Sequence, residues 1–213
     1  MTDILIDQNR DALLVVDVQN DFCPGGALEV VDGDAVLPVA NGLIGLFDHT
    51  IITQDWHPPG HSSFASSHAG RRPLEMIEMD YGPQTLWPDH CIQGSSGARF
   101  HNDLEADDAD LIIRKGRNPA IDSYSAFFEN DRTTPTGLSG YLATRSLSRL
   151  FLVGLATDFC VNFSALDARR EGFDVVLVED GCRAIDVNGS LDQAMVAMRD
   201  SGVRFANSGM IVA

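Results

Sequence analysis

Short runs of apolar, often β-branched residues alternate along the chain with longer stretches in which apolar residues recur at helical spacing. The short runs predict buried strands, and the longer stretches predict amphipathic helices. The predicted strands are residues 12–18, 50–54, 111–114, 149–155, 174–179 and 210–212, and the predicted helices are 34–47, 136–146, 158–171 and 188–201. This alternation is typical of a three-layer, Rossmann-like α/β fold, in which helices cover both faces of a mostly parallel six-stranded sheet.

One segment breaks the alternation. Residues 56–110 are rich in Pro, Gly, Ser and His, and they are too many for a loop unless a functional or cross-linking group orders them. No repeat, low-complexity segment or linker interrupts the 213 residues. A chain of this length can bury one sizeable core, so we expect a single domain over residues 1–213.

The block GLATDFC at residues 154–160 follows the predicted strand 149–155 and brings Cys160 to the start of a helix, with Thr157 or Asp158 as the cap. The helix dipole at that position favours thiolate, so we expect the Cys160 pKa to fall below its free value of about 8.5. The alternative is an inert, buried cysteine, which is the commoner fate of an intracellular thiol.

Polar groups follow four of the predicted strands. They are Asp17, Asp55, Lys115 and Cys160. Each alone has a structural explanation, as a turn cap or a solvated charge, but ligands of open parallel sheets bind where the carboxyl ends of the strands meet. Asp17 would accept the thiol proton, and Lys115 would hold the thiolate. No histidine belongs to this set, so the acid–base role falls to a carboxylate whose pKa is raised by burial or by substrate.

A second group of side chains suits a metal ion. Asp55 and His57 lie two positions apart in extended chain, so they point the same way, and His90 lies in WPDHC at residues 87–91. Nitrogen and oxygen ligands of this kind suit one divalent transition metal, with zinc first and iron or manganese as alternatives. Asp89 and Cys91 are rival ligands, and ordinary surface or capping histidines are the alternative explanation.

Charge and cysteine usage limit the partners. The formal net charge is −16 at pH 7. Such a chain repels nucleic acid and anionic membranes, so we expect a small-molecule substrate and leave a homo-oligomer open. No apolar stretch reaches the roughly 18 residues of a membrane span, and residues 1–7 lack the basic start of a signal peptide. Four cysteines without CxxC spacing indicate free thiols, and we expect a cytoplasmic protein.

Six blocks of sequence resemble the cysteine hydrolases of the isochorismatase-like superfamily, and within it the nicotinamidases, also called pyrazinamidases. They are VVDVQNDFCPGG at 15–26, TQDWHPPGHSSF at 53–64, WPDHC at 87–91, RKG at 114–116, DSYSAF at 122–127 and GLATDFCV at 154–161. The blocks run over most of the chain in the order that the family has. The resemblance implies a Rossmann-like sheet of about six strands, in agreement with the pattern of elements.

The resemblance also implies a role for individual residues. It implies a catalytic triad of Asp17, Lys115 and Cys160, an oxyanion hole of the Ala156 and Cys160 backbone amides, a ring pocket of Phe22, Trp87 and Tyr124, and a metal site of Asp55, His57 and His90. A cis peptide bond between Leu155 and Ala156 is implied as well. His61 departs from the family spacing for a fourth ligand, so we expect it to face substrate or solvent instead.

The implied activity is hydrolysis of nicotinamide to nicotinate and ammonia, and of pyrazinamide to pyrazinoate, through a Cys160 thioester in NAD salvage. The metal is expected to hold the ring nitrogen. Rival activities within the superfamily are hydrolysis of a vinyl ether and hydrolysis of a carbamoyl or ureido amide. Cys160 disfavours the first, and the two metal-ligand motifs disfavour both. A non-catalytic dinucleotide-binding module would need glycines directly after residues 12–18, and Asp17-Val18-Gln19 offers none.

Overall fold

The computed structural model describes residues 3–213, and its centre is a six-stranded sheet in which every neighbouring pair is parallel. In spatial order the strands are β6 (Leu111–Lys115), β3 (Thr50–Asp55), β2 (Asp11–Val16), β7 (Arg149–Leu155), β8 (Asp174–Arg183) and β9 (Arg204–Ala206). The chain therefore adds strands on both sides of β2. This is the predicted fold class, and the order reverses beside β2, where open α/β sheets bind their ligands.

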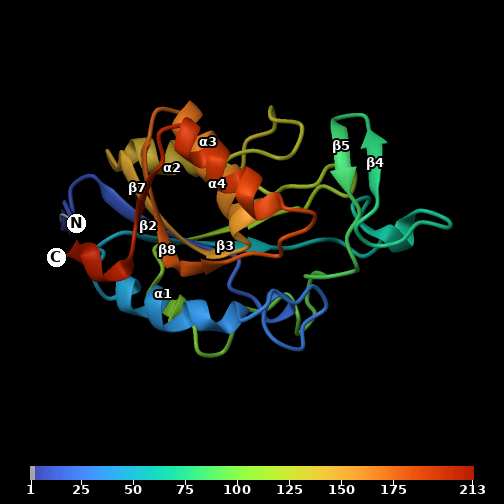
Figure 1. Ribbon diagram of the computed structural model, residues 1–213, viewed down its shortest axis with the longest axis horizontal. Coiled ribbons are helices and arrows are strands. Elements are labelled where there is room, and N and C mark those ends of the chain that lie inside the picture. The colour runs from blue at the N-terminus through green and yellow to red at the C-terminus, as the bar shows by residue number, and fades with distance from the viewer. Residues whose placement is uncertain (1–2) are drawn as a thin grey trace.

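Helices cover both faces of the sheet (Figure 1). Helix α1 (Leu37–Ile44) lies on one face, and α2 (Leu138–Thr144), α3 (Asn162–Arg170) and α4 (Ser190–Asp200) lie on the other. Side chains of β2 alternate between the two cores: Leu13 and Val15 pack with α1, whereas Leu14 and Val16 pack with the other three helices. Burial on both faces explains the unbroken apolar run of this strand.

The ends of the elements differ from the prediction in several places. The predicted last strand, residues 210–212, is β10 (Ile211–Val212), which pairs with β1 (Ile4–Leu5) outside the main sheet. The sixth strand of the sheet is β9, which is short and begins with an arginine and therefore gives no apolar run. The predicted helix 34–47 is a 3₁₀ turn (Gly33–Val36) followed by α1.

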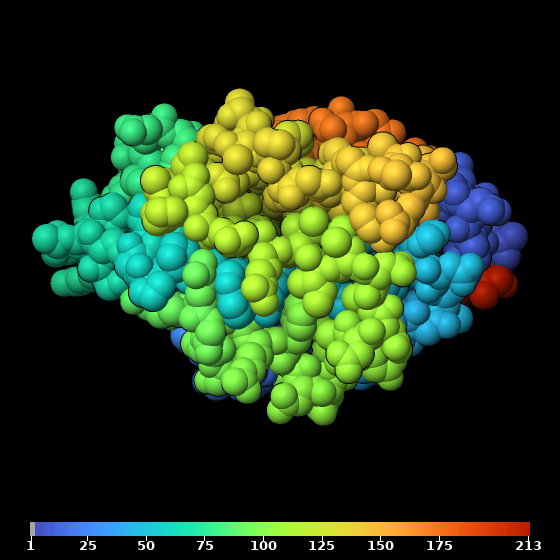
Figure 2. Space-filling view, turned by 180° about the vertical axis from the view of Figure 1, so that it is seen from behind, coloured from blue at the N-terminus to red at the C-terminus, as the bar shows by residue number. Residues whose placement is uncertain are grey.

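The long segment 56–110 is ordered by its contacts with the rest of the protein. It forms a hairpin of β4 (Met76–Met79) and β5 (Gly82–Thr85), which projects at one end of the molecule (Figure 1). Bridges of His57 to Ile92 and of Phe64 to Trp87 fold the segment back on itself. From the opposite side, the segment around β6, coloured green to yellow-green, covers the middle of the molecule (Figure 2).

Beyond β7 the chain makes a π-helical turn (Thr157–Val161) before α3 begins, so the helix predicted from residue 158 starts at Asn162. The approach of β7 to β2 requires glycine: Gly154 has φ +115°, and a Cβ there would lie 2.1 Å from the Val16 carbonyl oxygen. The two strand ends are thereby drawn together where the candidate chemistry begins. None of the helices in residues 3–213 combines the length and apolar character that a bilayer span requires.

Candidate active site and metal centre

Four strand ends deliver the predicted polar residues to one place. Asp17 follows β2, Asp55 ends β3, Lys115 ends β6 and Cys160 lies in the π-helical turn after β7. A small cavity opens beside them, lined mainly by aromatic, histidine and apolar side chains. Cys160 and Asp55 both line this cavity.

Lys115 is the centre of the polar network. Its Nζ lies 2.7 Å from Asp17 Oδ2, 3.1 Å from Asp55 Oδ1 and 3.3 Å from Cys160 Sγ, and it also donates to the Ser123 carbonyl oxygen at 3.1 Å. All four partner groups are buried with it. An ammonium group is stable in such surroundings only because carboxylates and hydrogen-bond acceptors replace its water.

Burial and neighbouring charges shift the pKa of each of these groups and so decide which of them is ionised. Burial lowers the pKa of Lys115, but Asp17 and Asp55 together raise it well above its usual range. Burial raises the pKa of Asp55, yet His57 and Lys115 hold it well below the usual range. Burial dominates at Asp17 and raises its pKa despite Lys115. Asp55 is therefore firmly ionised, whereas Asp17 is the carboxylate that accepts a proton readily.

The expected lowering of the Cys160 pKa is wrong for this structure. Burial raises the pKa of the Cys160 thiol well above its usual range, and Lys115 offsets only part of that effect. The position differs too, because Cys160 lies in a π-helical turn rather than in the first turn of α3. The thiol thus needs a base, and Asp17 is linked to it through Lys115.

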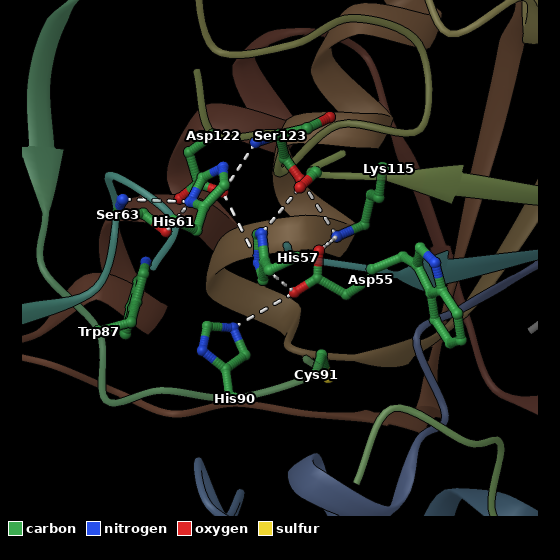
Figure 3. Close-up of polar contacts among 12 residues, drawn as sticks. Asp55, His57, His61, Ser63, Trp87, His90, Cys91, Lys115, Asp122 and Ser123 are labelled. Atoms are coloured by element: carbon green, nitrogen blue, oxygen red, sulfur yellow. Dashed lines mark hydrogen bonds and ion pairs between the residues drawn. The ribbon is translucent and has the colours of Figure 1, made fainter. Parts of the chain in front are cut away.

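Asp55, His57 and His90 converge on one point (Figure 3). The Nε2 atoms of His57 and His90 lie 2.9 and 3.2 Å from Asp55 Oδ2. Their Nδ1 atoms face backbone carbonyl oxygens, those of Gly116 at 3.0 Å and Pro88 at 2.8 Å. A carbonyl accepts the Nδ1 proton and so leaves Nε2 free for a metal. Gly116 keeps this arrangement open, since a Cβ there would lie 2.5 Å from the His57 ring. The donor set therefore fits a divalent transition metal.

His61 and Asp122 adjoin these ligands. The His61 Nε2 lies 2.7 Å from the Asn118 carbonyl oxygen, and its Nδ1 lies 2.7 Å from Ser63 Oγ, so both nitrogens already have protein partners. The expectation that His61 faces substrate or solvent is therefore wrong, because the residue is fully buried. Asp122 Oδ1 lies 3.9 Å from His57 Nε2, and Asp122 forms a second potential ligand group with His57 and His61. The sequence analysis did not single out Asp122, although it begins the motif DSYSAF.

Aromatic rings form the cavity wall. The predicted Phe22, Trp87 and Tyr124 all line the cavity. The Tyr124 hydroxyl accepts hydrogen bonds from Trp87 Nε1 at 3.0 Å and from Gln84 Nε2 at 2.9 Å. The sequence analysis missed three further residues that line the cavity, which are Leu28, Phe159 and Ile185. Of these, only Phe159 carried a signal, as the aromatic residue directly before Cys160.

Ala156 also lines the cavity, beside Cys160. The peptide bond between Leu155 and Ala156 is cis, as the resemblance implied. The turn that follows is held by Ser164, whose hydroxyl donates to the Cys160 carbonyl oxygen at 2.6 Å and accepts from the Ala126 amide at 2.8 Å. Ala156 and Cys160 therefore both lie at the cavity, and an oxyanion hole made of their backbone amides stays a prediction.

The fold and the cluster at the strand ends are those of a hydrolase built on a three-layer α/β sheet. A family model described as "Isochorismatase domain" matches residues 11–208. A nicotinamidase of Acinetobacter baylyi is 51% identical over 204 residues, which make up 96% of this chain and 95% of the relative. The chain belongs to the isochorismatase family and, within it, to the nicotinamidase and pyrazinamidase group.

Solved structures agree with this placement. A nicotinamidase and pyrazinamidase of Acinetobacter baumanii is 54% identical with a TM-score of 0.93, and the match covers 95% of this chain and 98% of that one. PnC1 of L. infantum in complex with nicotinate is 39% identical with a TM-score of 0.86, over 99% and 98% of the two chains. A pyrazinamidase of Pyrococcus horikoshii in complex with zinc is 34% identical with a TM-score of 0.75, over 93% and 99%.

Replacing Lys115 by methionine should destabilise the fold strongly. The substitution leaves Asp17 buried without a cation and removes one of the groups that compensate Asp55, and breaking a buried ion pair costs about 3–5 kcal/mol. Without Lys115 the folded-state pKa of Asp17 should rise further above its unfolded value, whereas His57 still lowers the pKa of Asp55. The variant should therefore lose stability as pH rises from the unfolded to the folded pKa of Asp17. The free energy of unfolding can be measured by urea denaturation with a chelator present, at about pH 4 and about pH 7. The loss relative to the parent protein should be larger at the higher pH.

The exposed Arg72 supplies the matched control. Arg72→Met also removes one positive charge, but it leaves no buried carboxylate without a compensating cation. Its unfolding free energy should change by less than about 0.5 kcal/mol at either pH. Equal losses of unfolding free energy in the Lys115 and Arg72 variants would show that Lys115 does not compensate the buried carboxylates of the site.

Proposed function

We propose that the protein hydrolyses nicotinamide to nicotinate and ammonia, and pyrazinamide to pyrazinoate, with Asp17, Lys115 and Cys160 as the catalytic residues. The observation that carries the proposal is the placement of Cys160 Sγ 3.3 Å from the Lys115 ammonium, with Asp17 on the same nitrogen, at the edge of a cavity lined by aromatic rings. A nucleophile, a cation and a carboxylate base at one cavity suit acyl transfer.

In the first half of the reaction, Asp17 accepts the Cys160 proton and Sγ attacks the carboxamide carbon. The negative charge that develops on the carbonyl oxygen is stabilised by the backbone amides of Ala156 and Cys160. Asp17 then returns the proton to the nitrogen as the C–N bond breaks, so that ammonia leaves and a thioester remains. Lys115 stabilises the thiolate and holds Asp17 beside it.

In the second half, Asp17 accepts a proton from water, and the resulting hydroxide attacks the thioester carbon. Collapse of the tetrahedral intermediate breaks the C–S bond and releases the carboxylic acid product, and Asp17 returns its proton to the Cys160 thiolate. The raised pKa of Asp17 suits both halves, because the residue must gain and lose a proton in each cycle. The high pKa of Cys160 suits a thiolate that forms only in the presence of substrate.

We further propose that Asp55, His57 and His90 hold one divalent metal, with zinc first and iron or manganese as alternatives. Two imidazole nitrogens and one carboxylate oxygen that converge within hydrogen-bond distance support the assignment. When bound there, the metal would supply a Lewis acid for the ring nitrogen of the substrate. The chain's own contribution is the orientation of the ring between Phe22, Trp87 and Tyr124.

We also place the activity in the cytoplasm and in NAD salvage. Cys23, Cys91, Cys160 and Cys182 are all free thiols, which fits a reducing compartment. The rival functions receive less support: a vinyl ether hydrolase gives no role to Cys160, and a dinucleotide-binding module would need a glycine-rich turn after β2, where the chain has Asp17-Val18-Gln19.

The purified protein should release ammonia from nicotinamide, and Cys160→Ala should reduce that release by several orders of magnitude, because no other thiol among residues 3–213 lines the cavity. The control is Cys182→Ala, since Cys182 is a buried cysteine on β8 outside the cavity. Mass spectrometry of quenched parent enzyme should find the acyl adduct on Cys160. Retention of more than a few per cent of the activity in Cys160→Ala would exclude the covalent route.

Elemental analysis should find about one transition metal per chain, and His90→Ala should lose it, because His90 supplies one of three converging ligands. His61→Ala is the matched control and should keep most of the metal, since both of its ring nitrogens are bonded to protein groups. If His61→Ala had as little bound metal per chain as His90→Ala, the three-ligand assignment would be wrong.

A further inference from the structure

We propose that Phe159 sets the upper size limit of the substrate, because its side chain stands between the active-site cavity and a larger open groove. The proposal rests on the proposed function and concerns which ring carboxamides that site accepts. Phe159 lines both spaces, and it is the only residue in the two sets of lining residues that they share.

The space available differs greatly on the two sides of Phe159. The space open to the centres of water-sized molecules is about 20 Å³ in the cavity that holds Cys160. It is about 470 Å³ in the groove on the other side, which runs between the hairpin, α4 and the start of α3. Removal of the side chain between them would therefore extend the cavity in one direction, toward the hairpin.

The Phe159 ring is part of the cavity's aromatic wall. Its centroid lies 4.8 Å from that of Trp87 at an interplanar angle of 86°, and 5.7 Å from that of Tyr124 at 72°. Both are edge-to-face arrangements, which hold the rings in defined positions. On the groove side, Phe163 contacts Tyr124 in the same way, with centroids 5.1 Å apart. Phe163 lines the groove but not the cavity.

The backbone around Phe159 is fixed by the preceding residue. The buried Asp158 carboxylate accepts hydrogen bonds from the amides of Ile185 at 3.1 Å and Asp186 at 2.9 Å, and from the Ser190 hydroxyl. Ile185 lines the cavity, whereas Ser190 lines the groove. The loop after β8 thus completes the partition and is tied to the turn that carries Phe159. Because the backbone is held in this way, the Phe159 side chain is the removable part of the partition.

The groove beyond Phe159 suits an apolar extension. Its walls include Leu74, Met76, Phe163 and Ala197, and the Met76 side chain is 68% exposed. The one carboxylate among the lining residues, Asp158, already accepts three hydrogen bonds from protein groups. A phenyl group attached to the substrate ring would therefore find apolar surface there rather than an unpaired charge.

The test compares nicotinamide with nicotinamides that carry a phenyl group at each free ring carbon in turn, so that no orientation of the ring is assumed. The quantity measured is kcat/KM for each compound relative to nicotinamide. The parent protein should favour nicotinamide over all of them. In Phe159→Ala the ratio should rise at least about tenfold for at least one phenyl compound, since pocket contacts of this size change discrimination by about 10- to 200-fold.

Phe163→Ala is the matched control: it removes an aromatic ring from the groove and opens no path into the cavity, so its ratios should equal those of the parent. Phe159→Leu, with melting curves for every variant, covers the case in which Phe159→Ala does not fold. It should shift the ratio in the same direction by a smaller amount.

A parent enzyme without activity on nicotinamide would overturn the proposed function, and this inference with it. An active parent whose ratios stay unchanged in the folded Phe159 variants would overturn the inference alone. Equal gains in Phe159→Ala and Phe163→Ala would also overturn it, because the gain would then reflect general loosening of the aromatic wall.

Discussion

The buried ion pairs of Lys115 with Asp17 and Asp55 are the constraint on which the rest of the site depends. A charge without water is stable only if opposite charges lie at contact distance, so three strand ends must meet with sub-ångström accuracy. The parallel sheet supplies that accuracy, because β2, β3 and β6 are neighbours or next neighbours and end at the same edge. The candidate metal ligands share the constraint, since one oxygen of Asp55 faces Lys115 and the other faces His57 and His90.

Much of this arrangement could be predicted from the sequence. Apolar runs located β2, β3, β6, β7 and β8. Four of these strands lie between two layers of helices and need apolar residues on both faces, whereas the edge strand β6 leaves Ile112 46% exposed. Once the strands were known, the rule that parallel strands end at a common edge was enough to bring Asp17, Asp55, Lys115 and Cys160 together. The catalytic roles of these residues remain predictions, whereas their proximity is a property of the structure.

The missed features depend on contacts between segments that are distant in sequence. The Cys160 pKa was wrongly expected to fall because local helix position was considered alone, whereas burial by the surrounding segments has the larger effect. Asp122 joins the metal ligands only because the loop after β6 folds back over His57. Phe159 forms a partition only because the loop after β8 is bonded to Asp158. The strand β9 was not predicted, because three residues beginning with arginine are too few to show an apolar run or an alternation of apolar and polar residues.

The central claim is that Asp17, held by Lys115, carries the proton between Cys160 and the leaving nitrogen. Its most direct test is the kcat of Asp17→Asn per folded, metal-loaded site, measured with the melting temperature and the affinity for nicotinamide, because the amide keeps the shape but cannot accept the proton. We expect a folded, substrate-binding protein whose kcat is lower by about 10²–10⁴-fold. A variant with near-normal kcat in whatever fraction folds, and a lowered melting temperature, would contradict this claim.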